Sequence, residues 1–375
     1  MRNKSVAVLD IRSGEICAAI AEKGVNNTFI IKNKNTRSFD GYAEGALLDT
    51  DDFSKAVRKV LSGIISSADS PVKQLYVSVP CEFIETKTTD NVISFHSSQK
   101  ISLNQLKAVT GNSVPEVKEN ESVIKCAALY YVLSDKRKLL NPVGMVSDSL
   151  RARLSFFICK SAFMDLVVRA AAPFKSIKVF HWFPQNYAEG LYLIDADKRD
   201  GYSILLDFGY ISSTFSVICG NGVAFSEAFS VGLGHMSLLI SDAFDIPFDA
   251  ATEFIGQVNL NAKESTDGEE EVFFDGKSYK ISSVQLRQVL REGLDGVCEM
   301  IETCLQSFAL KDLTGSPIYI TGEGVGVIRG FTEHLSSRLV TPVEVVAPKV
   351  PYYDKPKFSS LFSLLSVAIG GDNEL

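Results

Sequence analysis

Apolar runs and polar turns follow one another along the chain in a pattern that occurs twice. Residues 5–22, SVAVLDIRSGEICAAIAE, hold an apolar run ending at Asp10, a polar turn and a second apolar run. Residues 203–219, SILLDFGYISSTFSVIC, have the same layout, with Asp207 at the end of the first run. A third strand-like segment follows each copy, NTFIIKN and then GVAFSEAF. The repeat predicts a duplicated α/β domain with a cleft between the copies. Two unrelated β-hairpins would give a similar pattern, so the repeat alone does not decide the fold.

Other parts of the chain have helical periodicity. Residues 49–68, DTDDFSKAVRKVLSGIISSA, predict an amphipathic helix with an acidic start, and a longer helix is expected over residues 283–309. Between Cys81 and Pro173 the pattern changes to strands and short helices, which indicates a small α/β insertion. The acidic segment 262–280 is typical of a β-hairpin or a mobile edge.

The last apolar residues are also spaced as in a helix. Their polar neighbours are serines rather than lysines, so we expect a core-facing helix instead of a basic helix that lies on a membrane. A direct membrane anchor is therefore not expected. The residues of this predicted helix are Phe358, Leu361, Phe362, Leu365 and Ile369.

Composition narrows the class of protein. With 375 residues, 46% hydrophobic and 22% charged, the chain is typical of a globular protein of two or three domains. The net charge of -7 argues against general nucleic-acid binding. The seven cysteines form no CxxC pair and no Cys/His cluster, so we expect reduced thiols in a cytoplasmic protein. The apolar run at the N-terminus is too short for a signal peptide.

Five stretches in a consistent order resemble FtsA, the bacterial division family of the actin/Hsp70-like ATPases. They are spread along nearly the whole chain, and LLNPVGMVSDSLRARL is the most specific of them. The position of the insertion separates FtsA-like from MreB-like or Hsp70-like proteins, while PilM-like pilus-assembly proteins share the layout and compete as an interpretation. The other four stretches are AVLDIRSGEICAAIAE, LDFGYISSTFSVICGNGVAFSEAFSVGLGHMS, YITGEGVGVIRGF and KFSSLFSLLSVAIGG.

The resemblance implies an actin-like, ribonuclease H-like duplicated fold with two lobes around a cleft and an inserted SHS2-like subdomain. It implies the following divisions: lobe 1 at 1–80, 174–200 and 356–371, the insertion at 81–173, the lobe 2 core at 201–230 and 310–355, and an outer lobe 2 subdomain at 231–309. It also implies ATP and magnesium in the cleft and a role in tethering FtsZ polymers to the membrane.

The phosphate loops depart from the family pattern. Asp10 and Asp207, the implied magnesium positions, are kept, but Arg12 stands at a glycine position, and Tyr210 and Ile211 replace two glycines. A β-branched side chain disfavours the left-handed backbone conformations that let amides approach phosphates. We therefore expect weak or absent ATP binding and no hydrolysis. The open alternative is that Arg12 supplies a charged phosphate contact. The candidate nucleotide-binding residues are Asp10, Arg12, Ser13, Asp207, Gly209, Ser212, Glu253, Gly322 and Gly324.

These departures lead to three interpretations of function. The first is a non-enzymatic, FtsA-like scaffold in cell division, with FtsZ or another division or envelope protein as its partner. The second is an active, ATP-binding FtsA that polymerises, and the third is a PilM-like adaptor that takes up a peptide of a membrane partner. Arg287 and Arg291 are candidates for binding an acidic partner tail, although both positions also suit ordinary surface residues. We expect a cytoplasmic protein that a partner recruits to the membrane or division site, and self-association is a further expectation.

Overall fold

The computed structural model describes residues 5–25, 28–262, 268–308 and 316–370. Its first sheet has the strand order β11-β6-β1-β2-β3. Strands β1 to β3 form an antiparallel meander, and β6 and β11 add to β1 in parallel. The strands are β1 (Val6–Ile11), β2 (Glu15–Lys23), β3 (Phe29–Ser38), β6 (Gln74–Val79) and β11 (Val179–Pro184), beside the small pair β4 (Tyr42–Ala43) and β5 (Ala46–Leu47).

The second large sheet repeats this arrangement. Its order is β14-β13-β12-β17-β18, again an antiparallel meander followed by two parallel strands. Asp10 and Asp207 occupy equivalent positions, at or near the end of the first strand of each meander. The duplication predicted from the sequence is therefore confirmed. The strands are β12 (Tyr202–Asp207), β13 (Ser213–Cys219), β14 (Gly222–Phe229), β17 (Ile318–Thr321) and β18 (Val343–Val345).

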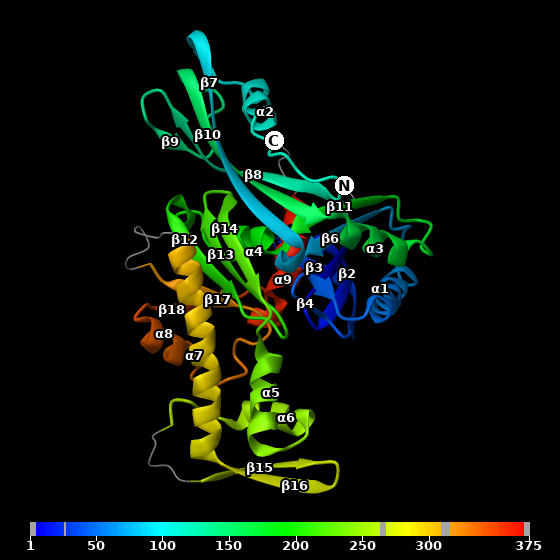
Figure 1. Cartoon of the computed structure of the whole chain (residues 1–375). Helices are drawn as coiled ribbons and strands as arrows, with labels where there is room; N and C mark the ends of the chain where they lie inside the picture. The colour runs from blue at the N-terminus through cyan, green and yellow to red at the C-terminus, as the bar shows by residue number, and fades with distance from the viewer. Residues whose placement is uncertain (1–4, 26–27, 263–267, 309–315, 371–375) are drawn as a thin grey trace.

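A third, antiparallel sheet projects from the two lobes at the top of Figure 1. Its order is β7-β10-β8-β9, and the helix α2 packs against it. These elements all lie within residues 81–173, where the sequence predicts an insertion. They are η2 (Cys81–Phe83), β7 (Ile84–Lys100), α2 (Leu103–Gly111), β8 (Glu121–Leu133), β9 (Lys138–Leu139), β10 (Val146–Lys160) and α3 (Ser161–Ala171).

At the opposite end lies a group of helices with the hairpin β15–β16 (Figure 1). The long helix α7 (Ser283–Ser307) agrees with the helix predicted from residue 283, and it reaches from this group to the second sheet. In the acidic segment 262–280, residues 263–267 lie outside the described part of the chain, and residues 269–280 belong to the hairpin. The elements are α5 (Leu233–Phe244), α6 (Phe248–Gln257), β15 (Glu269–Phe274), β16 (Lys277–Ser282) and α7; the helix α8 (Phe331–Leu339) joins β17 to β18.

Apolar burial explains where the helices lie. The predicted amphipathic helix is α1 (Thr50–Ile65), which begins after the cap Asp49 and buries its apolar face in the core of lobe 1. The helices α4 (Gln185–Leu193) and α9 (Ser359–Gly370) contact each other in a core that contains residues of both large sheets. Leu361, Phe362 and Leu365 of α9 are buried, so this helix faces the core, as expected. Short 3-10 helices occur at η3 (Lys198–Asp200) and η4 (Pro356–Phe358).

In the part of the chain that the structure describes, no helix has the length and apolar character needed to cross a bilayer. All seven cysteines are unpaired, and six of them are buried.

Candidate functional site

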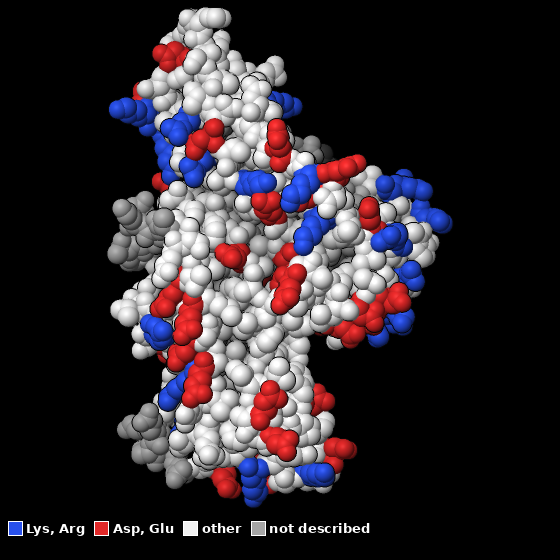
Figure 2. Space-filling model, viewed as in Figure 1, with Lys and Arg blue, Asp and Glu red and all other residues white. Residues whose placement is uncertain are grey.

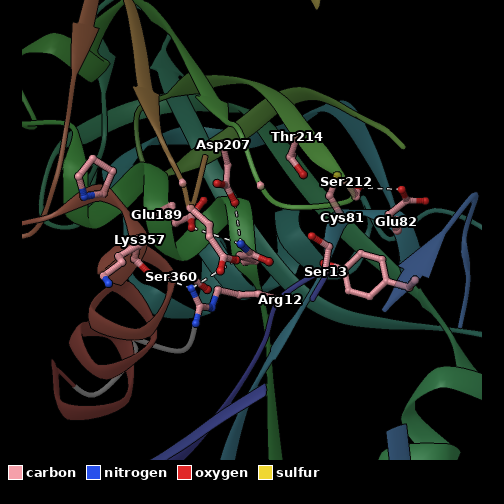
Figure 3. Close-up of a pocket in the computed structure, with 16 residues that line it drawn as sticks. Arg12, Ser13, Cys81, Glu82, Glu189, Asp207, Ser212, Thr214, Lys357 and Ser360 are labelled. Carbon is pink, nitrogen blue, oxygen red and sulfur yellow. Dashed lines mark hydrogen bonds and ion pairs between the residues drawn. The ribbon is translucent and has the colours of Figure 1, made fainter. Parts of the chain in front are cut away.

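The turns that follow β1 and β12 face each other across a cleft between the lobes (Figure 3). Arg12 and Ser13 come from the first turn, Gly209 and Ser212 from the second, and Gly322 from the turn after β17. Asp207 also lines this cleft, while Asp10 lies fully buried beneath it. The structure therefore brings together seven of the nine candidate residues, although it does not test what they bind.

The guanidinium group of Arg12 lies among carboxylates. Its Nε is 3.6 Å from Asp10 Oδ2, its Nη1 is 3.8 Å from Glu323 Oε2, and its Nη2 forms an ion pair with Glu15. Nη1 also donates a hydrogen bond of 3.0 Å to the carbonyl oxygen of Lys357 (Figure 3). Only 15% of the side chain is exposed, so solvent screens these charges weakly. Arg12 thus places a positive charge beside Asp10 and Glu323 in the cleft.

Asp10 is held by two serines from distant parts of the chain. Its Oδ1 accepts hydrogen bonds from Ser78 Oγ, at 2.9 Å, and from Ser360 Oγ on α9. Its Oδ2 has Arg12 as a charged neighbour but no hydrogen-bond partner. Burial raises the pKa of Asp10, and Arg12 and the two serines offset part of that rise. The Asp10 carboxylate therefore keeps one oxygen, Oδ2, without a hydrogen bond, and the Arg12 guanidinium is the positively charged group beside it.

The carboxyl groups of Asp207 and Glu189 are connected through the side-chain amide of Gln185. The Gln185 amide donates to Asp207 Oδ2 at 2.8 Å and to Glu189 Oε1 at 3.3 Å. Burial raises the pKa of Asp207 to about 7, with Arg12 opposing that rise and Asp10 adding to it. Burial also raises the pKa of Glu189 well above its usual range, and the charge of Asp207 raises it further. At least part of this pair is consequently protonated near neutral pH.

The two turns touch each other directly. The hydroxyl oxygen of Ser13 accepts a hydrogen bond of 3.0 Å from the backbone amide of Ile211. The ring of Tyr210 packs on Gly14, where a Cβ atom would meet the ring at 2.9 Å. The Ile211 side chain likewise contacts the backbone at Gly41. The Tyr210 side chain and the Ile211 amide therefore hold the second turn against the first, while the Ile211 side chain contacts the segment after β3.

Glu82, which the sequence analysis did not single out, joins further segments at the rim of the cleft. Its Oε1 accepts hydrogen bonds from Ser212 Oγ, at 2.7 Å, and from Ser230 Oγ, at 3.0 Å. Its Oε2 accepts one from the amide of Gly45, at 2.7 Å. The Ser212 hydroxyl is thus bound to a protein carboxylate.

The remaining candidate residues lie apart or are otherwise engaged. Gly322 has φ +109°, and a Cβ there would strike Asp207, so glycine is required by the turn itself. Gly324 packs against Phe208 and Glu253 lies on α6, and neither lines the cleft. The sequence analysis missed Gln185, Glu189 and Ser360. The i, i+4 spacing of Gln185 and Glu189 is the only sequence signal for these two residues, and no local signal indicates Ser360.

The two arginines proposed to bind a partner tail are both at least partly buried. Arg287 is buried in α7, with 5% of its surface exposed. Arg291 Nη2 donates a hydrogen bond of 2.8 Å to the carbonyl oxygen of Leu260. Their role in partner binding stays a prediction.

Little space remains between the two turns. The volume open to a water-sized molecule is about 20 Å³, which is enough for one water molecule. No three His, Cys, Asp or Glu side chains among the described residues are grouped so as to hold a metal ion. In this arrangement the cleft is closed by its own side chains.

Comparison with known proteins identifies the fold. No family model matches the sequence. The cell division protein FtsA of Streptococcus pneumoniae serotype 2 (strain D39 / NCTC 7466) is 18% identical over 369 residues, covering 96% of this chain and 79% of that protein.

Two solved structures share the architecture over nearly their whole length. The PilM-PilN type IV pilus biogenesis complex is similar with a TM-score of 0.63 and 14% identity, covering 97% of this chain and 98% of that one. MreB 5 of Spiroplasma citri bound to AMPPNP gives a TM-score of 0.58 and 12% identity, covering 98% and 96%. The chain therefore has the two-lobed actin-like fold and resembles the FtsA-like proteins of the actin/Hsp70-like ATPase superfamily, with PilM-like proteins as the competing resemblance.

Proposed function

We propose that this chain is a divergent FtsA-like scaffold of bacterial cell division whose cleft no longer holds Mg-ATP. The observation that carries the proposal is the position of the Arg12 guanidinium, 3.6 Å from Asp10. The resemblance implies magnesium beside this aspartate and its counterpart Asp207. A permanent side-chain cation instead compensates the carboxylates, so the folded chain gains less from binding a metal ion.

The packing of the turns supports the same proposal. A triphosphate needs backbone amides that point into an open loop, but the amide of Ile211 donates to Ser13 and the ring of Tyr210 covers Gly14. Glu323 adds negative charge at the cleft and would repel phosphate oxygens. These contacts favour a direct packing contact between the two turns over a nucleotide-binding site. We therefore assign no ATP hydrolysis to the chain.

Calorimetric titration with Mg-ATP, together with the melting temperature with and without ligand, tests the proposal. We expect no binding heat and no rise in melting temperature at about 1 mM ligand, because a ligand of the folded state stabilises only above its dissociation constant. An ATP-binding actin-like protein serves as the positive control.

Micromolar binding that disappears in Asp207→Ala would overturn the proposal. It would favour the alternative of an active, polymerising FtsA that tethers FtsZ, with Asp10 and Asp207 on magnesium and Arg12 on phosphate.

One observation favours a second candidate, a PilM-like adaptor of pilus assembly. The match to the PilM-PilN complex covers 98% of that chain, whereas the FtsA match covers 79% of its protein. Deletion of the gene separates the candidates. A division scaffold predicts elongated cells with fewer septa and normal pili, whereas an adaptor predicts normal division and loss of pili.

The proposal also includes the organisation and location of the protein. We propose that the subdomain limits implied by the resemblance hold, which is supported by the separate sheets of the two lobes and the insertion. We further propose that the chain is cytoplasmic and that a division or envelope partner, such as FtsZ, recruits it.

A further inference from the structure

A cavity lies in lobe 1, at the ends of β1 and β6 that point away from the cleft. It is bounded by Val6 and Ala7 of β1, by Gln74 and Tyr76 of β6, and by the loop that joins α1 to β6. Its volume is about 260 Å³, whereas the cleft offers about 20 Å³. A cavity of this size approaches the range of small-molecule sites, which is about 300 to 1,000 Å³. We call it the lobe 1 cavity.

The lobe 1 cavity forms because β1 and β6 are separated at their beginnings. Their parallel pairing begins at Val8 and Tyr76, two residues after the first residue of each strand. The first residues of the two strands therefore line the cavity instead of pairing with each other. The buried side chains of Ala7, Ile20 and Val72, which belong to the core of lobe 1, give the cavity an apolar wall.

Hydrogen bonds fix the loop after α1 on both sides of the cavity. Asn33 Nδ2 on β3 donates one of 3.1 Å to the carbonyl oxygen of Gly63 and another to Ser67 Oγ. At the other end of the loop, the carbonyl oxygen of Lys73 accepts one of 2.8 Å from the amide of Lys178. The walls of the cavity are thus formed without a ligand, as is usual for small-molecule sites.

The charged side chains that line the cavity favour an anion. Lys32 and Lys73 line it, with Asp69 as the acidic member among the described lining residues. Lys32 Nζ lies 3.5 Å from Glu22 Oε2, whereas Lys73 is exposed and forms no ion pair with any described residue. Figure 2 shows basic and acidic side chains interspersed over the lobe 1 face around α1. The lining residues, rather than the field of the whole lobe, therefore set the preference.

We propose that the lobe 1 cavity binds a small soluble anion with an apolar body, such as a carboxylate, sulfonate or phosphate monoester. The apolar body contacts the wall of Ala7, Ile20 and Val72, and the anionic group lies beside Lys73 at the mouth. An apolar wall with a few polar groups that orient the ligand is the usual construction of such a site. No cleft residue lines the cavity, so this inference goes beyond the proposed function and does not depend on it.

Calorimetric titration of the full chain with naphthalene-2-sulfonate, an anion of this class, tests the inference. We expect one site per chain with a dissociation constant below about 1 mM. The cation 2-naphthylmethylammonium carries the same apolar rings and should bind at least about tenfold more weakly, because it lies beside Lys73 with the wrong sign. The titrations contain neither nucleotide nor magnesium, so their outcome is separate from that of the Mg-ATP titration.

Two variants test the sign of the charge. Lys73→Gln should weaken binding of the sulfonate about fivefold, whereas Asp69→Asn should leave it unchanged or strengthen it. Lys59→Gln is the matched control, because Lys59 is an exposed lysine of α1 that does not line the cavity. Weaker binding in both Lys73→Gln and Asp69→Asn would indicate a zwitterionic ligand and would overturn the assignment of an anion.

Ala68→Phe tests the place of binding. Ala68 lines the cavity, so the larger side chain should fill it and abolish binding while the circular dichroism spectrum stays that of the wild type. If this variant is misfolded, Lys73→Gln and Lys59→Gln decide, since neither changes a buried side chain. Three results would each overturn the inference: no binding of the sulfonate below about 1 mM, equal binding of anion and cation, or binding that persists in folded Ala68→Phe.

Discussion

At the scale of single residues, Arg12 changes the chemistry of the cleft most. Arg12→Ala removes the cation between Asp10 and Glu323 and leaves Asp10 buried without a charged partner. Breaking a buried ion pair from one side typically costs about 3 kcal/mol of unfolding free energy. We expect a loss of that order in urea denaturation. The control is Arg338→Ala, whose side chain is 40% exposed and pairs with Glu302, and which should cost less than about 1 kcal/mol. Equal losses for the two variants would contradict the special position of Arg12.

Through Asp207, the unfolding free energy of the protein should depend on pH. Burial raises its pKa to about 7, against about 3.9 in an unfolded chain. Between these values the folded state binds a proton that the unfolded state lacks, so this group stabilises the fold most at low pH. Its contribution is lost as the pH rises through about 7. The charged and titratable neighbours are Arg12, Asp10, Glu323 and Glu189.

We therefore expect Asp207→Asn, which keeps an acceptor for Gln185, to remove part of the fall in unfolding free energy between pH 5 and pH 8. Denaturation curves of the wild type and the variant at both pH values measure this difference. An unchanged pH dependence in the variant would assign it to the other carboxyl groups.

The residues of the cleft were predicted to different degrees. Asp10 and Asp207 can be identified because an acidic residue at the end of an apolar run is recognisable in the sequence, and Arg12 because it stands at a glycine position of the family pattern. Ser360 cannot, because its contact with Asp10 spans 350 positions and depends on how α9 packs against β1. A periodic pattern predicts that α9 is buried, but not which of its polar side chains reaches a partner.

At the scale of elements, Glu82 connects three segments through one carboxylate. It lies in the short helix η2, three residues after the end of β6, and it accepts hydrogen bonds from the β4–β5 turn and from residues next to β13 and β14. Glu82→Gln should lower the unfolding free energy by about 1 to 3 kcal/mol, because it removes a charged acceptor and adds an amide donor that faces donors. Thermal unfolding measures the loss. Glu85→Gln is the control, since that side chain is 52% exposed and a near-neutral change is expected there.

Most elements of the two sheets follow from the sequence, because strand runs and turns are local signals. The parallel pairing of β1 with β6, and of β12 with β17, was not predicted, because it joins strands that lie far apart in the sequence. The outward position of Phe273 on the hairpin was not predicted, since the sequence does not show which face of an isolated pair of strands will be covered.

At the scale of the whole molecule, side-chain hydrogen bonds join lobe 2 to the inserted subdomain and to lobe 1. Thr86 and Ser226 share one of 2.7 Å, and Asn186 donates one of 3.2 Å to Ser216. With the Glu82 contacts, these bonds connect lobe 2 to the segments around it without any ligand. A lobe closure driven by nucleotide requires a ligand that distinguishes an open from a closed state. If Mg-ATP does not enter the cleft, small-angle scattering should be the same with and without about 5 mM ligand.

The same measurement on a chain with Glu82→Ala and Thr86→Ala distinguishes two reasons for an unchanged scattering profile. Either Mg-ATP does not bind at all, or the hydrogen bonds keep the lobes closed and exclude it. If the hydrogen bonds hold the lobes together, this variant should expand, and Mg-ATP should not restore the wild-type profile because no ligand bridges the cleft. A variant that contracts to the wild-type profile on addition of Mg-ATP would show that nucleotide still binds both lobes. That result would contradict the scaffold proposal even if calorimetry of the wild type had detected no binding, since closed lobes can keep a ligand out of an intact site.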